Sequence, residues 1–381
     1  MDSRRLFGTV LFAIFVLSTS AAAVLGRNDA AADSAMTGDG EGSLPSFSAT
    51  TDDPSQCAGR CDADFGQSCR CPRWTASAEF MGWFRVGGVN QALVTTYPVT
   101  PPPPAVNPPF VPGTGTERLN SQDLNQSFAA GPKVDLTYHG DYGYDVELSF
   151  FEIDGWNSAG IVLPNGQSPS FAAPGGFIQT TDTATQAMGW EYATRLYNAE
   201  LNARWALCPR VTMLAGFRWV ELWENLQGIL TPPALARKNP FWTTTTENDL
   251  YGFQIGEDWK IFERGRFSLD GLVKAGMFDN NAAETTGVSI YRRMYWESDA
   301  TNQLAFLGEI GLEAEYQLAQ RLLLKAGYQA IWLQGVALAP GQISKTFSNG
   351  DPGNTSVQAL GVDSGSGVFF HGATAGLEYA F

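Results

Sequence analysis

Four of the five cysteines in this 381-residue chain lie close enough in sequence to be cross-linked or to share a metal ion. They are Cys57, Cys61, Cys69 and Cys71, and the fifth, Cys208, stands alone. The Cys69-x-Cys71 pair is tighter than the C-x2-4-C pairs that usually bind zinc, so a zinc site is the weaker alternative. Exported chains use such clusters for disulfides, and the amino terminus described below carries an export signal. We expect disulfides among the four with the pairing left open, no bound metal, and Cys208 as a candidate free thiol.

The two histidines, His139 and His371, are poorly placed for catalysis. The residue alternation puts His139 beside a turn and points His371 toward lipid or the outer rim, so the two do not meet. A histidine-dependent hydrolase needs its base and a carboxylate within hydrogen-bond reach. No G-x-S-x-G, phosphate-binding loop or H-E-x-x-H motif occurs in the sequence. We expect no enzyme activity, no catalytic residues and no cofactor, and keep a membrane-embedded barrel enzyme as the least favoured alternative.

The largest set of candidate functional residues consists of charged side chains. They lie on the same parity in a series of segments that alternate apolar and polar residues. Residues of that parity would face the lumen of a barrel, where rings of charge set ion selectivity. Acidic residues outnumber basic ones on this face. The candidate pore-lining residues are Glu79, Glu147, Glu200, Arg204, Arg218, Asp270, Lys274, Glu309, Glu313, Glu315 and Lys325.

The segments that would position these charges alternate apolar and polar residues with a period of two. Most are about 10 residues long or more, which suits a strand tilted across a bilayer, whereas globular strands average about 5 to 6. They are 74–85, 134–139, 144–150, 197–205, 211–219, 251–261, 267–277, 304–318, 322–332 and 373–381.

The connections between these segments alternate strictly in length. Short turns are expected at 140–143, 206–210, 263–266 and 319–320, and long loops at 86–133, 154–190, 224–247, 279–302 and 334–366. Outer-membrane barrels place short turns in the periplasm and long loops outside the cell. We therefore predict an all-β, up-and-down transmembrane antiparallel β-barrel of about ten strands, with both termini in the periplasm.

The carboxyl terminus supports the barrel interpretation. Ala373, Ala375, Leu377, Tyr379 and Phe381 share one parity, and the chain ends on an aromatic residue. This resembles the last strand of bacterial outer-membrane proteins. The resemblance implies that Tyr379 and Phe381 form the signal read by the barrel assembly machinery.

The amino terminus has the composition of an export signal. Arg4 and Arg5 precede the apolar run 6–17, and an A-x-A cleavage site follows in 18–23. The run is too short for a transmembrane helix, which needs about 20 residues. We predict a cleaved signal peptide at 1–23, a disordered periplasmic segment with the cysteine cluster at 24–72, and the barrel at 73–381.

Several short motifs, in order, resemble one known family. They are Trp74–Trp83 with 92–96, then 199–202, 214–219 and 221–222, then 327–328, 336–340 and 342–343, and finally 371–373 and 376–379. Over residues 74–381 the chain resembles the seventh of the numbered families of putative β-barrel porins. The resemblance implies an outer-membrane barrel and says less about transport.

Charge and strand number limit the function. The formal net charge of -15 argues against nucleic acid as a partner, which leaves outer-membrane lipid, the assembly machinery and small solutes or ions. Barrels of about eight strands are filled by their own side chains, and clear aqueous channels belong to 16–18 strands. We expect a porin-like protein with a narrow, weakly cation-selective pore. The alternative is a non-conducting surface scaffold whose extracellular loops serve adhesion or binding.

Overall fold

The computed structural model describes residues 72–97, 116–124, 128–140, 143–163, 168–172, 178–180, 187–231, 242–290, 293–343, 346–348, 357–359 and 361–381. The predicted signal peptide lies outside these residues, as do Cys57, Cys61, Cys69 and Cys71. The predictions made for them stay predictions. Among the described residues, no helix is long and apolar enough to cross a bilayer.

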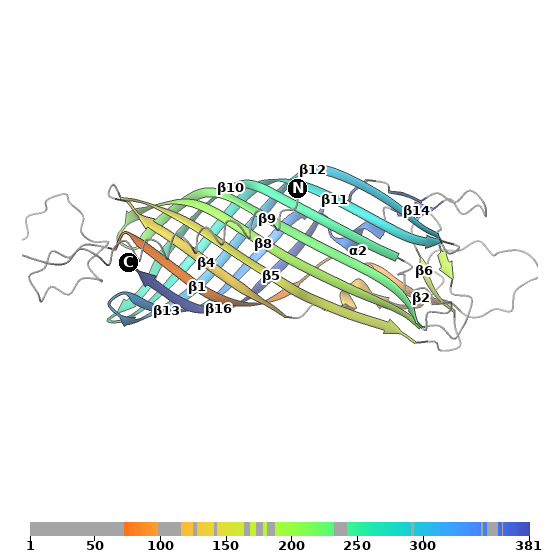
Figure 1. Ribbon diagram of the computed structural model, residues 1–381, viewed down its shortest axis with the longest axis horizontal. Coiled ribbons are helices and arrows are strands. Elements are labelled where there is room, and N and C mark those ends of the chain that lie inside the picture. The colour runs from red at the N-terminus through yellow and green to blue at the C-terminus, as the bar shows by residue number, and fades with distance from the viewer. Residues whose placement is uncertain are drawn as a thin grey trace, which may run out of the picture. The chain divides into compact units, whose positions relative to one another are not determined.

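Ten antiparallel strands form a closed barrel, which confirms the predicted fold class (Figure 1). Around the barrel the strand order is β1-β16-β13-β12-β11-β10-β9-β8-β5-β4, and β4 pairs with β1 to close it. The strands are β1 (Trp74–Val86), β4 (Ala129–His139), β5 (Tyr144–Val162), β8 (Ala187–Cys208), β9 (Val211–Thr231), β10 (Trp242–Arg264), β11 (Phe267–Ile290), β12 (Arg293–Ala319), β13 (Leu322–Val336) and β16 (Ser366–Ala380).

Alternation along each strand separates an inner from an outer surface, as the sequence predicted. In β1, Glu79 and Trp83 are 5% and 0% exposed, whereas Phe80 between them is 61% exposed. In β10, Gln254 is buried while Phe253 and Ile255 stand out from the wall. The exposed apolar residues form a belt suited to lipid, and the buried ones face the lumen.

Short turns join the strands at one end of the barrel, as expected, and both chain ends of the barrel lie at this turn end. The described residues of these turns are 140 and 143, 209–210, 265–266 and 320–321. Phe381 and Trp74 exchange two backbone hydrogen bonds, of 2.9 and 3.1 Å, where the last strand meets the first.

The opposite, loop end differs from the prediction. The loops expected at 224–247 and 279–302 are largely strand, because β9 runs to Thr231, β10 begins at Trp242, and only residues 291–292 separate β11 from β12. The strict alternation of short and long connections is therefore wrong at β11–β12. The physical reason is that the strands continue past the apolar belt, where outward residues become polar: Glu221 pairs with Asp249, and Asp279 pairs with Tyr251.

The barrel wall is higher on one side than on the other. Pairing of β12 with β13 ends at Phe306 and Gln334, so β12 continues without a β13 partner up to Arg293. Pairing of β1 with β16 likewise ends at Val86 and Phe369.

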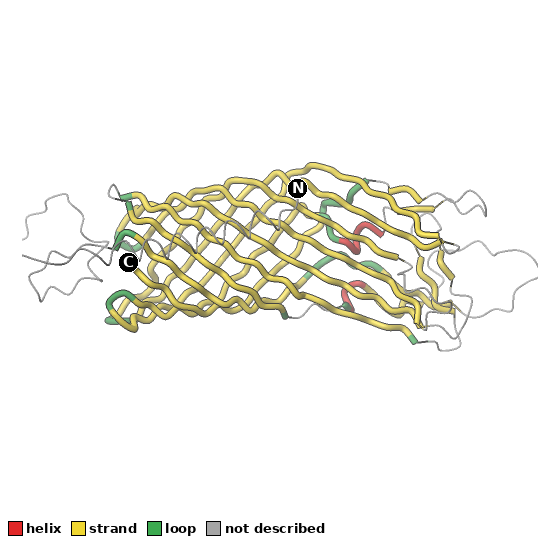
Figure 2. Tube along the Cα trace, in the orientation of Figure 1, coloured by secondary structure: helices red, strands yellow, loops and turns green. Residues whose placement is uncertain are grey.

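Short elements from the loops lie at the loop end. They are the sheet β3-β2-β6-β7, from β2 (Ala92–Tyr97), β3 (Thr116–Asn120), β6 (Ser168–Ala172) and β7 (Ile178–Thr180); the pair β14 (Thr346–Ser348) and β15 (Val357–Ala359); a 3-10 helix at Ser121–Asp123; and α2 (Ala339–Gln342), red in Figure 2.

Candidate functional site: the lumen of the barrel

Side chains from strands that are not neighbours meet inside the barrel, and this defines the lumen. From the turn end to the loop end it contains a charged layer, an apolar layer and an upper layer of mixed polar and apolar side chains. Alternation predicted which residues point inward. It did not predict these layers.

The centre of the charged layer is a buried network of two cations and two carboxylates. Arg218 of β9 places Nη1 2.6 Å from Glu309 Oε2 of β12 and 3.4 Å from Glu200 Oε1 of β8. Lys274 of β11 places Nζ 2.9 Å from Glu200 Oε2 and 3.5 Å from Glu309 Oε1. Gln254 Nε2 donates to Glu200 Oε2 at 2.7 Å. The four charges therefore balance one another across the lumen and are hydrogen-bonded, the condition for burying ions.

A second network lies on the side of the lumen formed by β13, β1 and β4. Lys325 Nζ is 2.8 Å from Glu313, 3.5 Å from Glu378 and 3.6 Å from Glu79. Lys133 Nζ is 3.5 Å from Glu79. Each lysine contacts carboxylates on more than one strand, so the network ties the first strands to the last.

A third contact set lies between β5, β8 and β10, where Arg204 pairs with both Glu147 and Asp258. Asn202 Nδ2 donates to Glu147 Oε1 at 3.0 Å. Thus nine of the predicted pore-lining residues join ion-pair networks: Glu79, Glu147, Glu200, Arg204, Arg218, Lys274, Glu309, Glu313 and Lys325.

The other two predicted pore-lining residues, Asp270 and Glu315, lie nearer the turn end. Ser268 Oγ donates to Asp270 at 3.3 Å and to Glu315 at 3.2 Å. All eleven predicted residues are thus placed, and their role in passing ions stays a prediction.

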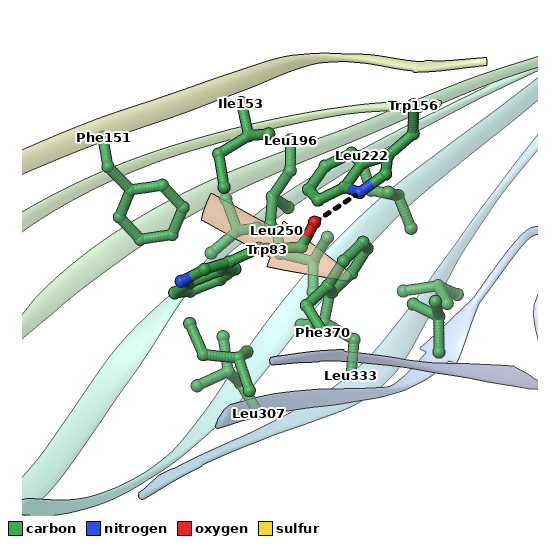
Figure 3. Close-up of a cluster of buried hydrophobic side chains, with 14 of the residues drawn as sticks. Trp83, Phe151, Ile153, Trp156, Leu196, Leu222, Leu250, Leu307, Leu333 and Phe370 are labelled. Atoms are coloured by element: carbon green, nitrogen blue, oxygen red, sulfur yellow. Dashed lines mark hydrogen bonds between the residues drawn. The ribbon is translucent and has the colours of Figure 1, made fainter. Parts of the chain in front are cut away.

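Above the charges lies an apolar layer that sequence reasoning missed (Figure 3). Trp156 Nε1 donates to the Trp83 carbonyl at 3.2 Å, and the Trp156 and Phe370 rings are 5.0 Å apart. Every barrel strand contributes at least one buried apolar side chain to this layer. The layer consists of Met81, Trp83, Ala129, Phe151, Ile153, Trp156, Leu196, Val220, Leu222, Leu250, Phe278, Ala305, Leu307, Ile331, Leu333, Val336, Leu338, Val368 and Phe370.

One sequence signal could have revealed this layer. Met81 and Trp83 are large apolar residues on the parity that carries Glu79 and Arg85. An apolar pair on the polar parity indicates a filled lumen at that height, because a hydrated pore would expose it to water.

The upper layer is closed by residues 335–343, which we call the strap. The Ala337 N–H donates to Asn248 Oδ1 at 2.7 Å, and Asn248 Nδ2 donates to the Ala337 carbonyl at 2.8 Å. Asn280 Nδ2 donates to the Gly335 carbonyl at 2.9 Å. Gly335 has φ +88, a left-handed conformation that turns the chain inward at the end of β13.

A buried ion pair anchors the other side of the strap. Arg85 of β1 lies 2.5 Å from Glu224 of β9 and donates to Tyr192 Oη at 2.7 Å. The Ala339 N–H donates to the same Glu224 carboxylate at 3.0 Å. The strap is therefore bonded to β9, β10 and β11 at once.

His139 lies at the turn end, as expected, where it contacts a carboxylate. Its Nδ1 is 2.9 Å from Asp145 Oδ2, and its Nε2 is 2.8 Å from Thr75 Oγ1. This contact arises because His139 and Asp145 are paired positions on β4 and β5. His371 faces outward, with Nδ1 2.6 Å from Tyr328 Oη.

One further sequence prediction concerns a single thiol. Cys208 is exposed and free, as expected for the unpaired cysteine. Within the part of the chain that the structure describes, no cluster of three or more His, Cys, Asp or Glu residues is arranged to hold a metal ion.

The closed β-barrel agrees with the protein family that the sequence matches. The model of the putative beta barrel porin-7 family matches residues 74–381. The chain belongs to this family and is an outer-membrane β-barrel of porin-like class. Since such barrels keep their short turns in the periplasm, the loop end is extracellular.

Solved structures of other outer-membrane barrels match this chain with low sequence identity and low TM-scores. The outer membrane protease OmpT from Escherichia coli is 9% identical with a TM-score of 0.44, over 83% of this chain and 99% of that one. The toluene transporter TbuX of Ralstonia pickettii is 8% identical with a TM-score of 0.31, over 82% and 90% of the two chains. Similarities this low carry no functional argument. No curated protein sequence matches the chain.

Proposed function

We propose that this protein is a closed barrel that anchors an extracellular scaffold in the outer membrane and does not conduct ions. The observation that carries the proposal is the apolar layer, to which all ten strands contribute. An ion crossing it would have to leave water without a partner, which is strongly unfavourable. The ion-pair networks beneath add support, because their charges are already neutralised by one another.

The scaffold would present the tall part of the wall, β8 to β12, and the loops above it. Loop residues pack against the inner face of this wall: Leu93 and Leu119 share a buried cluster with Trp190, Trp242 and Ile343. A loop layer with its own apolar contacts is suited to a lasting binding surface, since its shape does not depend on a partner.

Planar-bilayer recording tests the proposal directly. The wild-type protein should give no single-channel steps after verified insertion. The variant Trp83→Ala/Trp156→Ala/Phe370→Ala should give steps, because it removes both tryptophan rings of the apolar layer and the phenylalanine ring that packs against Trp156. A control triple variant on the lipid-facing side, Phe80→Ala/Phe217→Ala/Phe253→Ala, should remain silent. Regular steps from the wild-type protein would overturn the closed-barrel proposal.

The second candidate is the narrow, weakly cation-selective pore. The excess of acidic over basic residues on the inner parity favours it, although conduction would require the strap and the apolar layer to move. In that case wild-type steps should be cation-selective, and Glu309→Gln with Glu313→Gln should shift them toward anions. Catalysis is the third and weakest candidate. Among the described residues its support is the Thr75–His139–Asp145 chain, and we interpret this chain as a cross-strand hydrogen-bond ladder.

We also propose that residues 1–23 are removed on export and that Cys57, Cys61, Cys69 and Cys71 form two disulfides. Export to an oxidising compartment and the cysteine spacing support this. Intact mass of the mature protein should show loss of the first 23 residues and gain four thiol hydrogens on reduction. Retained residues 1–23, four free thiols or a bound zinc ion would contradict it.

A further inference from the structure

The outer face of the barrel wall carries a hollow near the loop end. It measures about 340 Å³ and lies across β5, β8 and β9. Its outward residues form two rungs in register, Asn157–Ala193–Asn225 and Ala159–Glu191–Gln227. The two alanines create the depression, because every other member of the rungs has a longer, hydrogen-bonding side chain.

The rungs above and below give the hollow its borders. Below it, Arg195 forms a 3.0 Å ion pair with Asp154, and its guanidinium lies 4.6 Å from the centre of the Trp223 ring. Above it, Ile161 and Ile229 flank Gly189. The hollow therefore combines polar walls with apolar edges.

The polar groups suit a neutral ligand with many hydroxyls. Asn157 and Gln227 each offer a donor and an acceptor in one plane, and Glu191 offers two acceptor oxygens. Asn225 offers its carbonyl oxygen, since its Nδ2 donates to Thr245 Oγ1 at 2.8 Å. Hydroxyls on adjacent carbons also donate and accept, so a sugar ring can bond to several of these groups at once. A phosphate is disfavoured, because Glu191 is negative and the nearby Arg195 is already paired with Asp154.

The height of the hollow points to the sugars of a membrane glycolipid. The lipid-facing belt ends at the aromatic residues Tyr197, Trp219 and Tyr251. Asn225 lies six residues above Trp219 along β9, which is roughly 15 Å above the belt for a tilted strand. The headgroup region adds only about 5 to 8 Å to each side of the hydrocarbon. The hollow thus lies beyond the lipid phosphates, where glycolipid sugars extend from the outer leaflet.

We propose that this hollow binds a neutral sugar unit of an outer-leaflet glycolipid. Because the site lies on the outer wall, its occupancy does not depend on whether the lumen conducts.

The test measures binding of the full-length protein in detergent to three probes. They are lipopolysaccharide with its core oligosaccharide, the free core oligosaccharide, and lipid A, which carries the phosphates and acyl chains without core sugars. Ala193→Trp fills the hollow and should weaken binding of the first two probes at least ten-fold, with lipid A binding unchanged. Ala283→Trp, the same change on the outer face of β11 one rung lower, should match wild type.

A second variant tests the same site without adding bulk, in case the first variant does not fold. Asn157→Ala/Gln227→Ala removes two hydrogen-bonding groups without adding bulk and should weaken both sugar-bearing probes about ten-fold. Heat-modifiable migration in gels verifies that each variant forms the barrel. Wild-type affinity in Ala193→Trp, binding that follows lipid A alone, or no binding of the free oligosaccharide would each overturn the proposal.

Discussion

Arg218 shows how a filled barrel accommodates charge at the scale of one residue. Its side chain is fully buried, and it contacts Glu309, Glu200, Asn198 and Gln254. The number of contacts does not give the contribution of Arg218 to the free energy of unfolding, because the desolvation of buried charges offsets much of their attraction. The clear effect is the cost of removing one partner, which leaves a charge buried without compensation.

Arg218→Met should lower the free energy of unfolding by about 3–5 kcal/mol, because Glu309 and Glu200 lose a shared cation. Urea unfolding followed by tryptophan fluorescence measures the change. The matched control is Arg195→Met, whose exposed pair with Asp154 should be worth no more than about 1 kcal/mol. Adding Glu309→Gln to Arg218→Met should recover part of the loss. Equal effects of the two arginine variants would contradict the buried-network argument.

At the scale of elements, the strap depends on one side chain, Asn248. Its amide mimics a backbone partner, since it both donates to and accepts from Ala337. Removing this amide leaves the N–H and the carbonyl of Ala337 without their side-chain partner in a buried site, which costs about 1–3 kcal/mol for each of the two groups.

Asn248→Ala should therefore loosen the strap and leave the barrel intact. Amide hydrogen exchange of residues 335–343 should become at least ten-fold faster, while that of β8 and β9 stays unchanged. Asn225→Ala, on the outer face one strand away, serves as the control and should not alter exchange in the strap. Unchanged protection of 335–343 in Asn248→Ala would show that packing alone holds the strap.

The last strand closes the barrel through its final residue. Phe381 exchanges backbone hydrogen bonds with Trp74, and its ring stacks 6.3 Å from that of Tyr379. Deletion of Phe381 should prevent insertion and leave the protein aggregated or degraded in the periplasm, as fractionation and immunoblotting would show. Phe381→Tyr keeps an aromatic terminus and should insert. Normal outer-membrane yield of the deletion would refute an assembly role for Phe381.

Residue alternation predicted the strands of the barrel but not how far they extend at the loop end. The alternation in β1, β9 and β12 identified strands, their inner faces and the turns, because each residue's side follows from parity alone. It failed above the belt, where Glu221, Asp249 and Asp279 make the outer face polar and the pattern resembles a loop. It also missed the apolar layer, because parity does not give height. The height of Trp83 relative to Phe370 depends on register around the whole barrel.

At the scale of the molecule, the orientation of the barrel can be tested with its own free thiol. Cys208 is exposed at the end of β8, beside the turn to β9, and should be periplasmic. On intact cells, an impermeant maleimide should label Asn281→Cys on the outer face of β11 and leave Cys208 unlabelled. Gln320→Cys, in another turn, should react only after permeabilisation. Labelling of Gln320→Cys on intact cells would reverse the topology.

The apolar layer has a consequence for biogenesis. Trp83 comes from the first strand, Trp156 from the third barrel strand along the chain and Phe370 from the last. These three cover one another only when the chain is complete and its seam is closed. A truncated or stalled barrel would instead hold a water-exposed apolar interior, a mark by which periplasmic chaperones and proteases can distinguish unfinished chains from finished ones. The packing that closes the lumen would thus also report that synthesis and closure are complete.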